Sequence, residues 1–282
     1  MLERMRARAV HHPVIVYFIL AYALSWSICA LLIADHNGLV TVPGGLHYLV
    51  SFGPALAALI VTALIGGRRG LSELLSRITR WRTRWLLVGL FSPLALAGSA
   101  LLANYLLSGR WPDLAALGQV SYLGDIGVAA ALLLWIATFG FGEEIGWRGF
   151  ALHNLQQKQS PMRAALLIGV FWALCHLPEF FYKPNFIALG MGGFLGFAIG
   201  VIAGSVLLTW LYNRSGSSIL VVALWHAVFD FTTATSAAEG TIAALTSVFV
   251  MVWAIVVGVM AIWRPNKGLL LPTAAVQANN GG

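Results

Sequence analysis

The sequence predicts an all-α, polytopic membrane protein with about eight transmembrane helices. Its 282 residues are 59% hydrophobic and only 10% charged, whereas a typical soluble domain is roughly 25% charged. Apolar runs long enough to cross a bilayer recur along the chain. Most of the basic residues fall between alternate pairs of these runs, as expected for a chain that crosses a membrane repeatedly.

The apolar runs define eight expected spans within a single transmembrane domain over residues 1–263. The first run follows a basic start but is too long for a signal peptide and has no small-residue cleavage site, so we expect it to be retained. The eight expected spans are 13–34, 46–66, 85–107, 124–157, 161–177, 186–212, 218–235 and 241–263. Residues 264–282 are expected to form a disordered cytoplasmic tail.

Positive charge predicts the orientation of these spans. If eight spans are right, 14 of the 17 Lys and Arg residues lie on one side, only Arg110 and Lys183 lie on the other, and Arg148 lies within a span. This bias places both termini in the cytoplasm of a multi-pass protein of the cell membrane. The same bias accounts for the net charge of +7 without a nucleic-acid partner.

A few ionisable residues interrupt the apolar spans, where a charge costs roughly 2.5–3.5 kcal/mol on insertion scales. They are Glu143, Glu144, Arg148, His176, His226 and Asp230. The fourth and fifth spans are expected to turn near Ser160, which places Glu143 and His176 both about 25 Å from that turn. A modest overhang of this helical pair brings His226 to the same layer, so we predict that these side chains converge.

Residue spacing predicts how the side chains face. Glu144 and Arg148 are four residues apart and can pair on one helix face, while Glu143 is rotated away from that face. The second carboxylate then neutralises the arginine and the first is left to act. His226 and Asp230 are also four apart and can point at one spot.

These groups favour hydrolysis, by one of two routes. A carboxylate and an imidazole can share a water and remove its proton, while further donors stabilise an oxyanion. Alternatively, Glu143, His176, His226 and Asp230 can hold a divalent metal such as zinc that activates the water. A serine or cysteine nucleophile is less favoured. The two cysteines, Cys29 and Cys175, stand alone in apolar runs and indicate neither a disulfide framework nor a thiolate metal site.

Three motifs in this region resemble those of the CPBP (Abi) intramembrane proteases, which include the type II CAAX prenyl endopeptidases. EEIGWR at 143–148 resembles the EExxxR motif, WALCH at 172–176 the FxxxH motif and HAVFD at 226–230 the HxxxN/D motif. They occur in family order within a motif region of about 120–235. Trp172 replaces the Phe of the second motif, and Asp230 stands where the prenyl proteases have Asn.

The resemblance implies an eight-helix fold around an intramembrane catalytic cavity open toward the cytoplasm. It implies Glu143 as general base helped by His176, with His226 and Asp230 at the oxyanion or at a metal, and with Glu144, Arg148 and Trp172 supporting the site. An ionised Asp230 cannot donate to an oxyanion, so it must be protonated, orient His226 or bind metal.

The expected activity is an intramembrane endopeptidase that cuts a peptide or protein substrate, membrane-associated or lipidated, near the cytoplasmic face. A proton-coupled transporter and a catalytically silent scaffold or immunity protein are the alternatives, because intramembrane Glu and His also serve proton relays.

Three further features have a mainly structural interpretation. Gly192, Gly196, Gly200 and Gly204 form a ladder in the sixth span that favours tight helix packing, with sideways entry of a substrate segment as a second hypothesis. Glu179 is expected to be solvated at the outer side. His47 flanks a span and carries no functional signal.

Overall fold

The computed structural model describes residues 10–238 and 240–263. Within these residues, seven helical segments are long and apolar enough to cross a membrane, and the all-α polytopic fold is confirmed. The predicted seventh span is a shorter apolar helix of 16 residues, α9 (Ile219–Ala234). At 1.5 Å per residue it is about 24 Å long, less than the roughly 30 Å hydrocarbon core. It packs inside the bundle against α4, α5, α8 and α10.

Most elements follow the predicted spans within a few residues, but the second span, predicted at 46–66, is displaced, because its helix runs from Phe52 to Ser76. The longer helices are α2 (Pro13–His36), α3 (Phe52–Ser76), α4 (Thr83–Ser108), α7 (Pro161–Cys175), α8 (Pro184–Arg214) and α10 (Thr241–Trp263). The fourth span is divided into α5 (Val128–Trp135), η3 (Ile136–Glu143), η4 (Ile145–Leu152) and α6 (His153–Leu155). Short elements complete the described chain: η1 (Gly44–Leu49), η2 (Leu114–Gly118), β1 (Gln119–Val120), β2 (Gly124–Asp125) and η5 (Leu177–Phe181).

The predicted start of the fourth span at residue 124 is wrong. Residues 119–125 form a two-stranded antiparallel hairpin, with Gln119 opposite Asp125 and Val120 opposite Gly124. The helix begins only at Val128, because Gly124 (φ 72°) and Gly127 (φ 80°) take left-handed conformations that interrupt it. The two glycines, which favour turns, therefore determine where the helix begins, although the surrounding residues are apolar.

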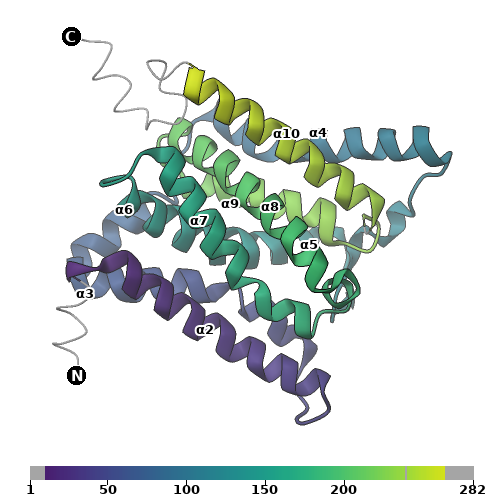
Figure 1. Ribbon diagram of the computed structural model, residues 1–282, viewed down its shortest axis with the longest axis horizontal. Coiled ribbons are helices and arrows are strands. Elements are labelled where there is room, and N and C mark those ends of the chain that lie inside the picture. The colour runs from purple at the N-terminus through teal and green to yellow at the C-terminus, as the bar shows by residue number, and fades with distance from the viewer. Residues whose placement is uncertain (1–9, 239, 264–282) are drawn as a thin grey trace.

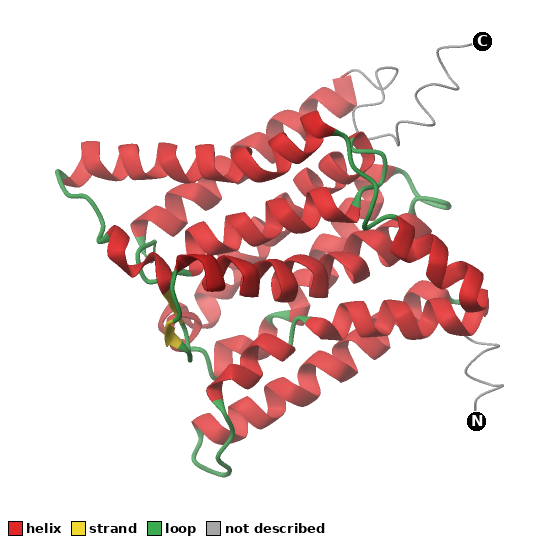
Figure 2. Cartoon of the chain, turned by 180° about the vertical axis from the view of Figure 1, so that it is seen from behind, coloured by secondary structure: helices red, strands yellow, loops and turns green. Residues whose placement is uncertain are grey.

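The helices run between two ends of the bundle (Figures 1 and 2). One end carries the connections 77–82, 156–160 and 215–218, and we call it the cation-rich end. The other carries the connections 37–51, 109–127, 176–183 and 235–240, and we call it the cation-poor end. Figure 2 shows the β-hairpin at the same end as the loops that follow α2 and α4. The predicted tail at 264–282 and the basic residues before position 10 lie outside the described residues.

The segment that carries the two glutamates is π-helical rather than α-helical, over both η3 and η4. Glycines let it approach two neighbours closely: a Cβ at Gly146 would lie 2.6 Å from the backbone of Pro54, and one at Gly140 would lie 2.8 Å from the Ala223 carbonyl oxygen. Real Cβ atoms do not come so close to backbone atoms. The glycines therefore fix the carboxylates against α3 and α9, and π-helical turns are frequently found at functional sites.

Candidate active site

Glu143 is buried at the centre of the bundle, with 5% of its surface exposed. Two indole N–H groups donate to the same carboxylate oxygen, Oε2: Trp147 Nε1 at 3.1 Å and Trp172 Nε1 at 2.6 Å. No hydrogen bond from the described residues reaches the other oxygen, Oε1. One oxygen is therefore fixed while the other remains able to accept a proton.

A cavity of about 20 Å³ lies beside this carboxylate. Glu143, Trp172 and His176 line it together, along with Cys175 and Ser51. A cavity needs roughly 10–15 Å³ of this kind of volume to hold one water molecule. The space between the candidate base and the first candidate histidine thus matches a single water.

His176 lies at the end of α7 and is half-buried. Its Nδ1 is 2.8 Å from the Trp172 carbonyl oxygen, an acceptor, so Nδ1 carries the hydrogen. In the neutral ring the lone pair is then on Nε2. The backbone contact consequently sets the tautomer that is able to accept a proton.

Glu144 and Arg148 form the pair that their four-residue spacing predicts. Arg148 Nη1 donates to Glu144 Oε1 at 2.7 Å, and both side chains are fully buried. The guanidinium carbon also lies 4.4 Å from the centre of the Trp172 ring. Arg148 therefore contacts the same indole that donates to Glu143, and the pair supports the base through Trp172.

His226 lies between two carboxylates. Its Nδ1 is 2.9 Å from Glu144 Oε1, and its Nε2 is 3.3 Å from Asp230 Oδ2. The imidazole also meets the Trp172 ring edge to face, with 5.1 Å between the ring centres. Of the roles that the sequence leaves open for Asp230, this geometry favours orienting His226.

The seven predicted site residues therefore come together around the Trp172 indole, which contacts Glu143, Arg148, His176 and His226. The functional roles of these residues remain predictions. Sequence reasoning missed Trp147, the second donor to Glu143. Its position four residues after Glu143, on the same helix face, was the available signal.

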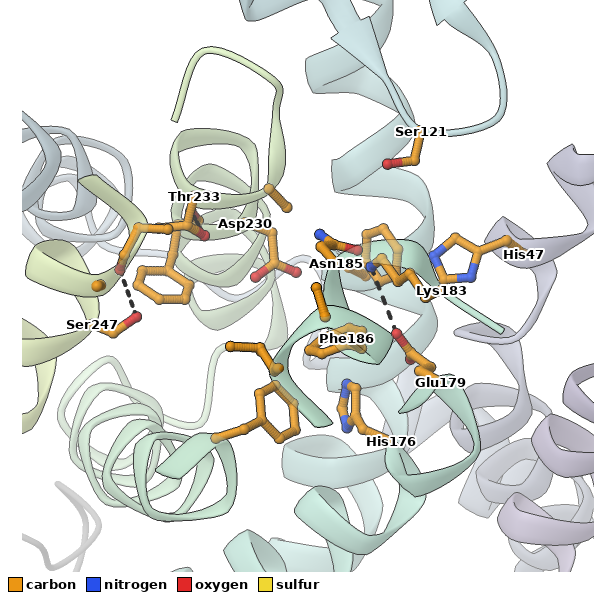
Figure 3. A pocket seen from close by; sticks show the side chains of 18 of the residues that line it. His47, Ser121, His176, Glu179, Lys183, Asn185, Phe186, Asp230, Thr233 and Ser247 are labelled. Carbon is orange, nitrogen blue, oxygen red and sulfur yellow. Dashed lines mark hydrogen bonds and ion pairs between the residues drawn. The ribbon is translucent and has the colours of Figure 1, made fainter. Parts of the chain in front are cut away.

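Two larger cavities meet at His176 and Asp230. One, of about 550 Å³, is the polar chamber, and its polar lining residues include His47, Ser121, Glu179, Lys183, Asn185 and Thr233. The other, of about 560 Å³, is the glycine chamber, and its lining includes Gly193, Gly196, Gly200, Gly204, Val201 and Val248. Both volumes lie in the range of small-molecule binding sites. Figure 3 shows His176 and Asp230 projecting into the polar chamber from different helices.

The glycine ladder does not pack tightly, so the favoured interpretation from sequence is wrong. A Cβ added at Gly192, Gly196, Gly200 or Gly204 would meet no atom within 4 Å. The last three glycines line the glycine chamber instead. Because glycine has no side chain, these positions leave space in the cavity. This agrees with the second hypothesis, in which a substrate segment enters sideways.

Two further expectations are corrected at the polar chamber. Glu179 is buried, not solvated, and its carboxylate lies 3.6 Å from Lys183 Nζ (Figure 3). His47 is also buried, with Nδ1 2.8 Å from the Tyr182 hydroxyl. Burial and the nearby Glu179 carboxylate raise the pKa of Tyr182, so this phenol stays protonated beside His47. The loops that carry these residues fold back over the chamber, which hydropathy does not reveal.

The residues present do not fit the metal route that the sequence left open. Within residues 10–238 and 240–263, no three His, Cys, Asp or Glu side chains converge as metal ligands do. Nε2 of His226 lies 3.3 Å from Asp230 Oδ2, and Nδ1 of His176 faces a carbonyl oxygen. Glu143 directs one oxygen at two N–H donors. This donor set is arranged for hydrogen bonding and proton transfer.

Comparison with known proteins places this site in context. Residues 125–232 match the family described as type II CAAX prenyl endopeptidase Rce1-like. Over 113 residues the chain is 32% identical to CAAX prenyl protease 2 of Methanococcus maripaludis. Over this segment the chain is similar to the CAAX prenyl proteases. The segment matched to the family contains all seven predicted site residues, and the alignment spans 39% of this chain and 41% of the archaeal protein.

The Trp172→Phe substitution tests the indole that stands where the FxxxH motif has Phe. Phe keeps the aromatic ring but removes the donor to Glu143. A hydrogen bond to a charged group contributes about 1.5–3 kcal/mol. For the cleavage reaction proposed below, we therefore expect kcat to fall by about tenfold to a hundredfold. KM should change little, because the substrate pocket is retained. The Trp85→Phe variant is the control. The buried Trp85 N–H has no hydrogen-bond partner among the described residues, and the ring lines none of these cavities. Equal kcat in the two variants would show that the Trp172 N–H has no role.

The Gly200→Leu substitution tests the glycine chamber. A Cβ added here would meet no atom within 4 Å, and Gly200 lines the chamber. We expect kcat/KM for substrates with a large apolar group to fall by about tenfold or more, because the side chain occupies their volume. The matched control is Gly98→Leu in α4, where an added Cβ also has open space but lines none of these cavities. Unchanged kinetics in Gly200→Leu would mean that substrate does not enter the chamber.

Proposed function

We propose that the protein is an intramembrane endopeptidase that hydrolyses a peptide bond with water activated by Glu143 and His176. The observation that carries this proposal is the water-sized cavity lined by both residues. The relationship to the CAAX prenyl proteases supports peptide-bond cleavage as the reaction. The finer assignment of residues to steps rests on the geometry alone.

In the proposed reaction the water oxygen attacks the scissile carbonyl carbon while a carboxylate oxygen of Glu143 takes the water proton. His176 accepts a hydrogen bond from the same water through Nε2 and orients it. The attack forms a tetrahedral intermediate with a negative oxygen. Glu143 then returns the proton to the leaving amine nitrogen as the C–N bond breaks.

The oxyanion of that intermediate requires a donor. His226 Nε2 is the candidate, since its 3.3 Å separation from Asp230 Oδ2 is a long contact that can be exchanged for the oxyanion. Before the intermediate forms, this contact with Asp230 holds the ring in place, and Glu144 lies beside its other nitrogen. An ionised Asp230 therefore assists without donating a proton itself.

The substrate is proposed to be a membrane-associated or lipidated peptide. The glycine chamber offers an apolar volume next to the reacting groups, and the polar chamber offers hydrogen-bonding side chains on the other side of His176 and Asp230. A peptide with an apolar anchor and a hydrophilic cleaved segment matches this division. A metal, if bound, would supply Lewis-acid activation of the water, but the donor set does not fit one.

The test is cleavage of an acyl- or prenyl-modified peptide library by purified protein in proteoliposomes, with products identified by mass spectrometry. Wild-type protein and the Cys175→Ala variant should cleave the same peptides, because Cys175 lines the cavity without a proposed role. No cleavage of any library member by wild-type protein would argue against an endopeptidase.

Chelation provides a separate prediction for the same assay. Because the site residues do not converge as metal ligands, we expect cleavage rates to stay within about twofold of the untreated rate after exhaustive treatment with EDTA or 1,10-phenanthroline. The control is a zinc peptidase in the same proteoliposomes, which should lose activity. Loss of activity that added zinc restores would contradict the metal-free mechanism.

A further inference from the structure

The chambers are lined by residues from the cation-poor end of the bundle. Each connection at that end contributes lining residues to the polar chamber, including His47, Ser121, Lys183 and Gly240. None of the connections at the cation-rich end contributes to either chamber. The route from water to His176 and Asp230 therefore begins at the cation-poor end.

The route from the opposite end is closed by packed side chains. Below Glu143, η4 contributes Trp147 and Leu152, both fully buried, and α9 contributes Ile219, also fully buried. Arg77 Nη1 donates to the Gly149 carbonyl at 2.7 Å and joins the end of α3 to the same segment. The cavity at this end, lined by His153, Gln156 and neighbours, includes none of the seven site residues.

The two ends differ strongly in charge. Within the described residues, the cation-rich end and its flanking helix termini hold Arg68, Arg69, Arg77, Arg80, Arg82, Arg84, Lys158, Arg163 and Arg214. The cation-poor end holds Arg110 and Lys183. Lys and Arg in short connections are retained on the cytoplasmic side during insertion. The charge distribution thus assigns the cavity mouth to the non-cytoplasmic face.

We propose that the active site takes its substrate from the non-cytoplasmic face of the membrane. This inference rests on the proposed peptidase function. It replaces the expectation that cleavage occurs near the cytoplasmic face. The substrate is accordingly a peptide segment that emerges on the outer side, next to an apolar anchor in the outer half of the bilayer. A cytosolic peptide that never crosses the membrane does not reach the site.

Cysteine accessibility in intact cells tests this directly. The native Cys29 and Cys175 are both buried, so an exposed introduced cysteine can be read against them. Asn185→Cys reports on the polar chamber, Ser108→Cys on the cation-poor end and Gln159→Cys on the cation-rich end, and all three positions are exposed. The probe is a membrane-impermeant maleimide, applied before and after permeabilisation.

We expect the Asn185→Cys and Ser108→Cys variants to react in intact cells and the Gln159→Cys variant to react only after permeabilisation. Ser121→Cys and Gln157→Cys serve as second reporters of the chamber and the cation-rich end if a first variant does not accumulate. Reaction of the Asn185→Cys or Ser121→Cys variant only after permeabilisation, whatever the other positions do, overturns the proposal.

This readout does not depend on activity and so separates the two proposals. A second experiment tests the two proposals together. It uses proteoliposomes sorted for one orientation, and a cleavable peptide is supplied to one face at a time. Cleavage only from the face at which the Asn185→Cys variant reacts supports the inference, and cleavage only from the other face refutes it. If no cleavage occurs from either face, the result counts against the peptidase function. The cysteine accessibility result then still determines on which side of the membrane the chamber opens.

Discussion

The Glu143→Gln variant is expected to lose about 10²- to 10⁴-fold of its turnover while folding normally. Glutamine has nearly the same shape, and its amide oxygen can still accept from the Trp147 and Trp172 indoles. It cannot accept a proton from water. The measurement is the single-turnover rate of peptide cleavage in proteoliposomes, with Glu73→Gln as the control because the Glu73 side chain is largely exposed.

Retention of wild-type turnover in the Glu143→Gln variant would remove the general base from the proposed mechanism. If a biological effect of the protein persisted in this variant and in His226→Ala, the silent scaffold interpretation would be favoured instead. Substrate-dependent proton flux in the same vesicles, without cleavage, would favour a transporter.

The Arg148→Met variant is expected to lose about 3–5 kcal/mol of stability, the largest folding effect of any substitution considered for this site. Met fills much of the same volume, but Glu144 would be left as a buried carboxylate without its 2.7 Å partner. Thermal unfolding in detergent, followed by tryptophan fluorescence, should show a clear drop in midpoint. Activity should also fall, because the guanidinium no longer supports Trp172.

The control for this effect is the double variant Glu144→Gln with Arg148→Met. Removing both charges leaves no uncompensated carboxylate, so the double variant should be more stable than Arg148→Met alone. A double variant that is less stable than the single one would show that the carboxylate of Glu144 has another cationic partner strong enough to hold it. His226 is the only such neighbour that the described residues provide.

The fold was predictable because a bilayer permits few alternatives. Only α-helices and closed β-barrels satisfy their backbone hydrogen bonds within lipid, so the apolar runs were expected to form helices. Each of the eight predicted spans corresponds to a helical segment in the structure. The start of the fourth span was missed because Gly124 and Gly127 look unremarkable in an apolar run until their positive φ angles are known.

Much of the site was predictable for a similar reason. Ionisable residues are too costly in lipid to be scattered, so the few present were expected to converge, and helical spacing gave the Glu144–Arg148 pair. The importance of Trp172 was underestimated, because a single sequence does not show that its N–H reaches Glu143 on another helix. Replacement of Phe by Trp thus adds a donor to the site.

Features formed by loops and by empty space were not predictable. Hydropathy placed Glu179 in water because it follows Pro178 at a span end, yet η5 turns it back into the protein beside Lys183. The glycine ladder has the same sequence pattern whether it packs against a helix or lines a cavity. Only the positions of α8, α9 and α10 decide between the two, and these positions depend on packing across the whole bundle.

The most direct test of a Glu143-held water is a single turnover in H₂¹⁸O, with enzyme in excess over peptide. If Glu143 acts as a general base, the new carboxyl terminus of the product carries one ¹⁸O atom and the enzyme peptide that contains Glu143 carries none. Transfer of ¹⁸O into the Glu143 carboxylate would show that this side chain attacks the substrate itself, and it would contradict the hydrolytic water on which the account depends.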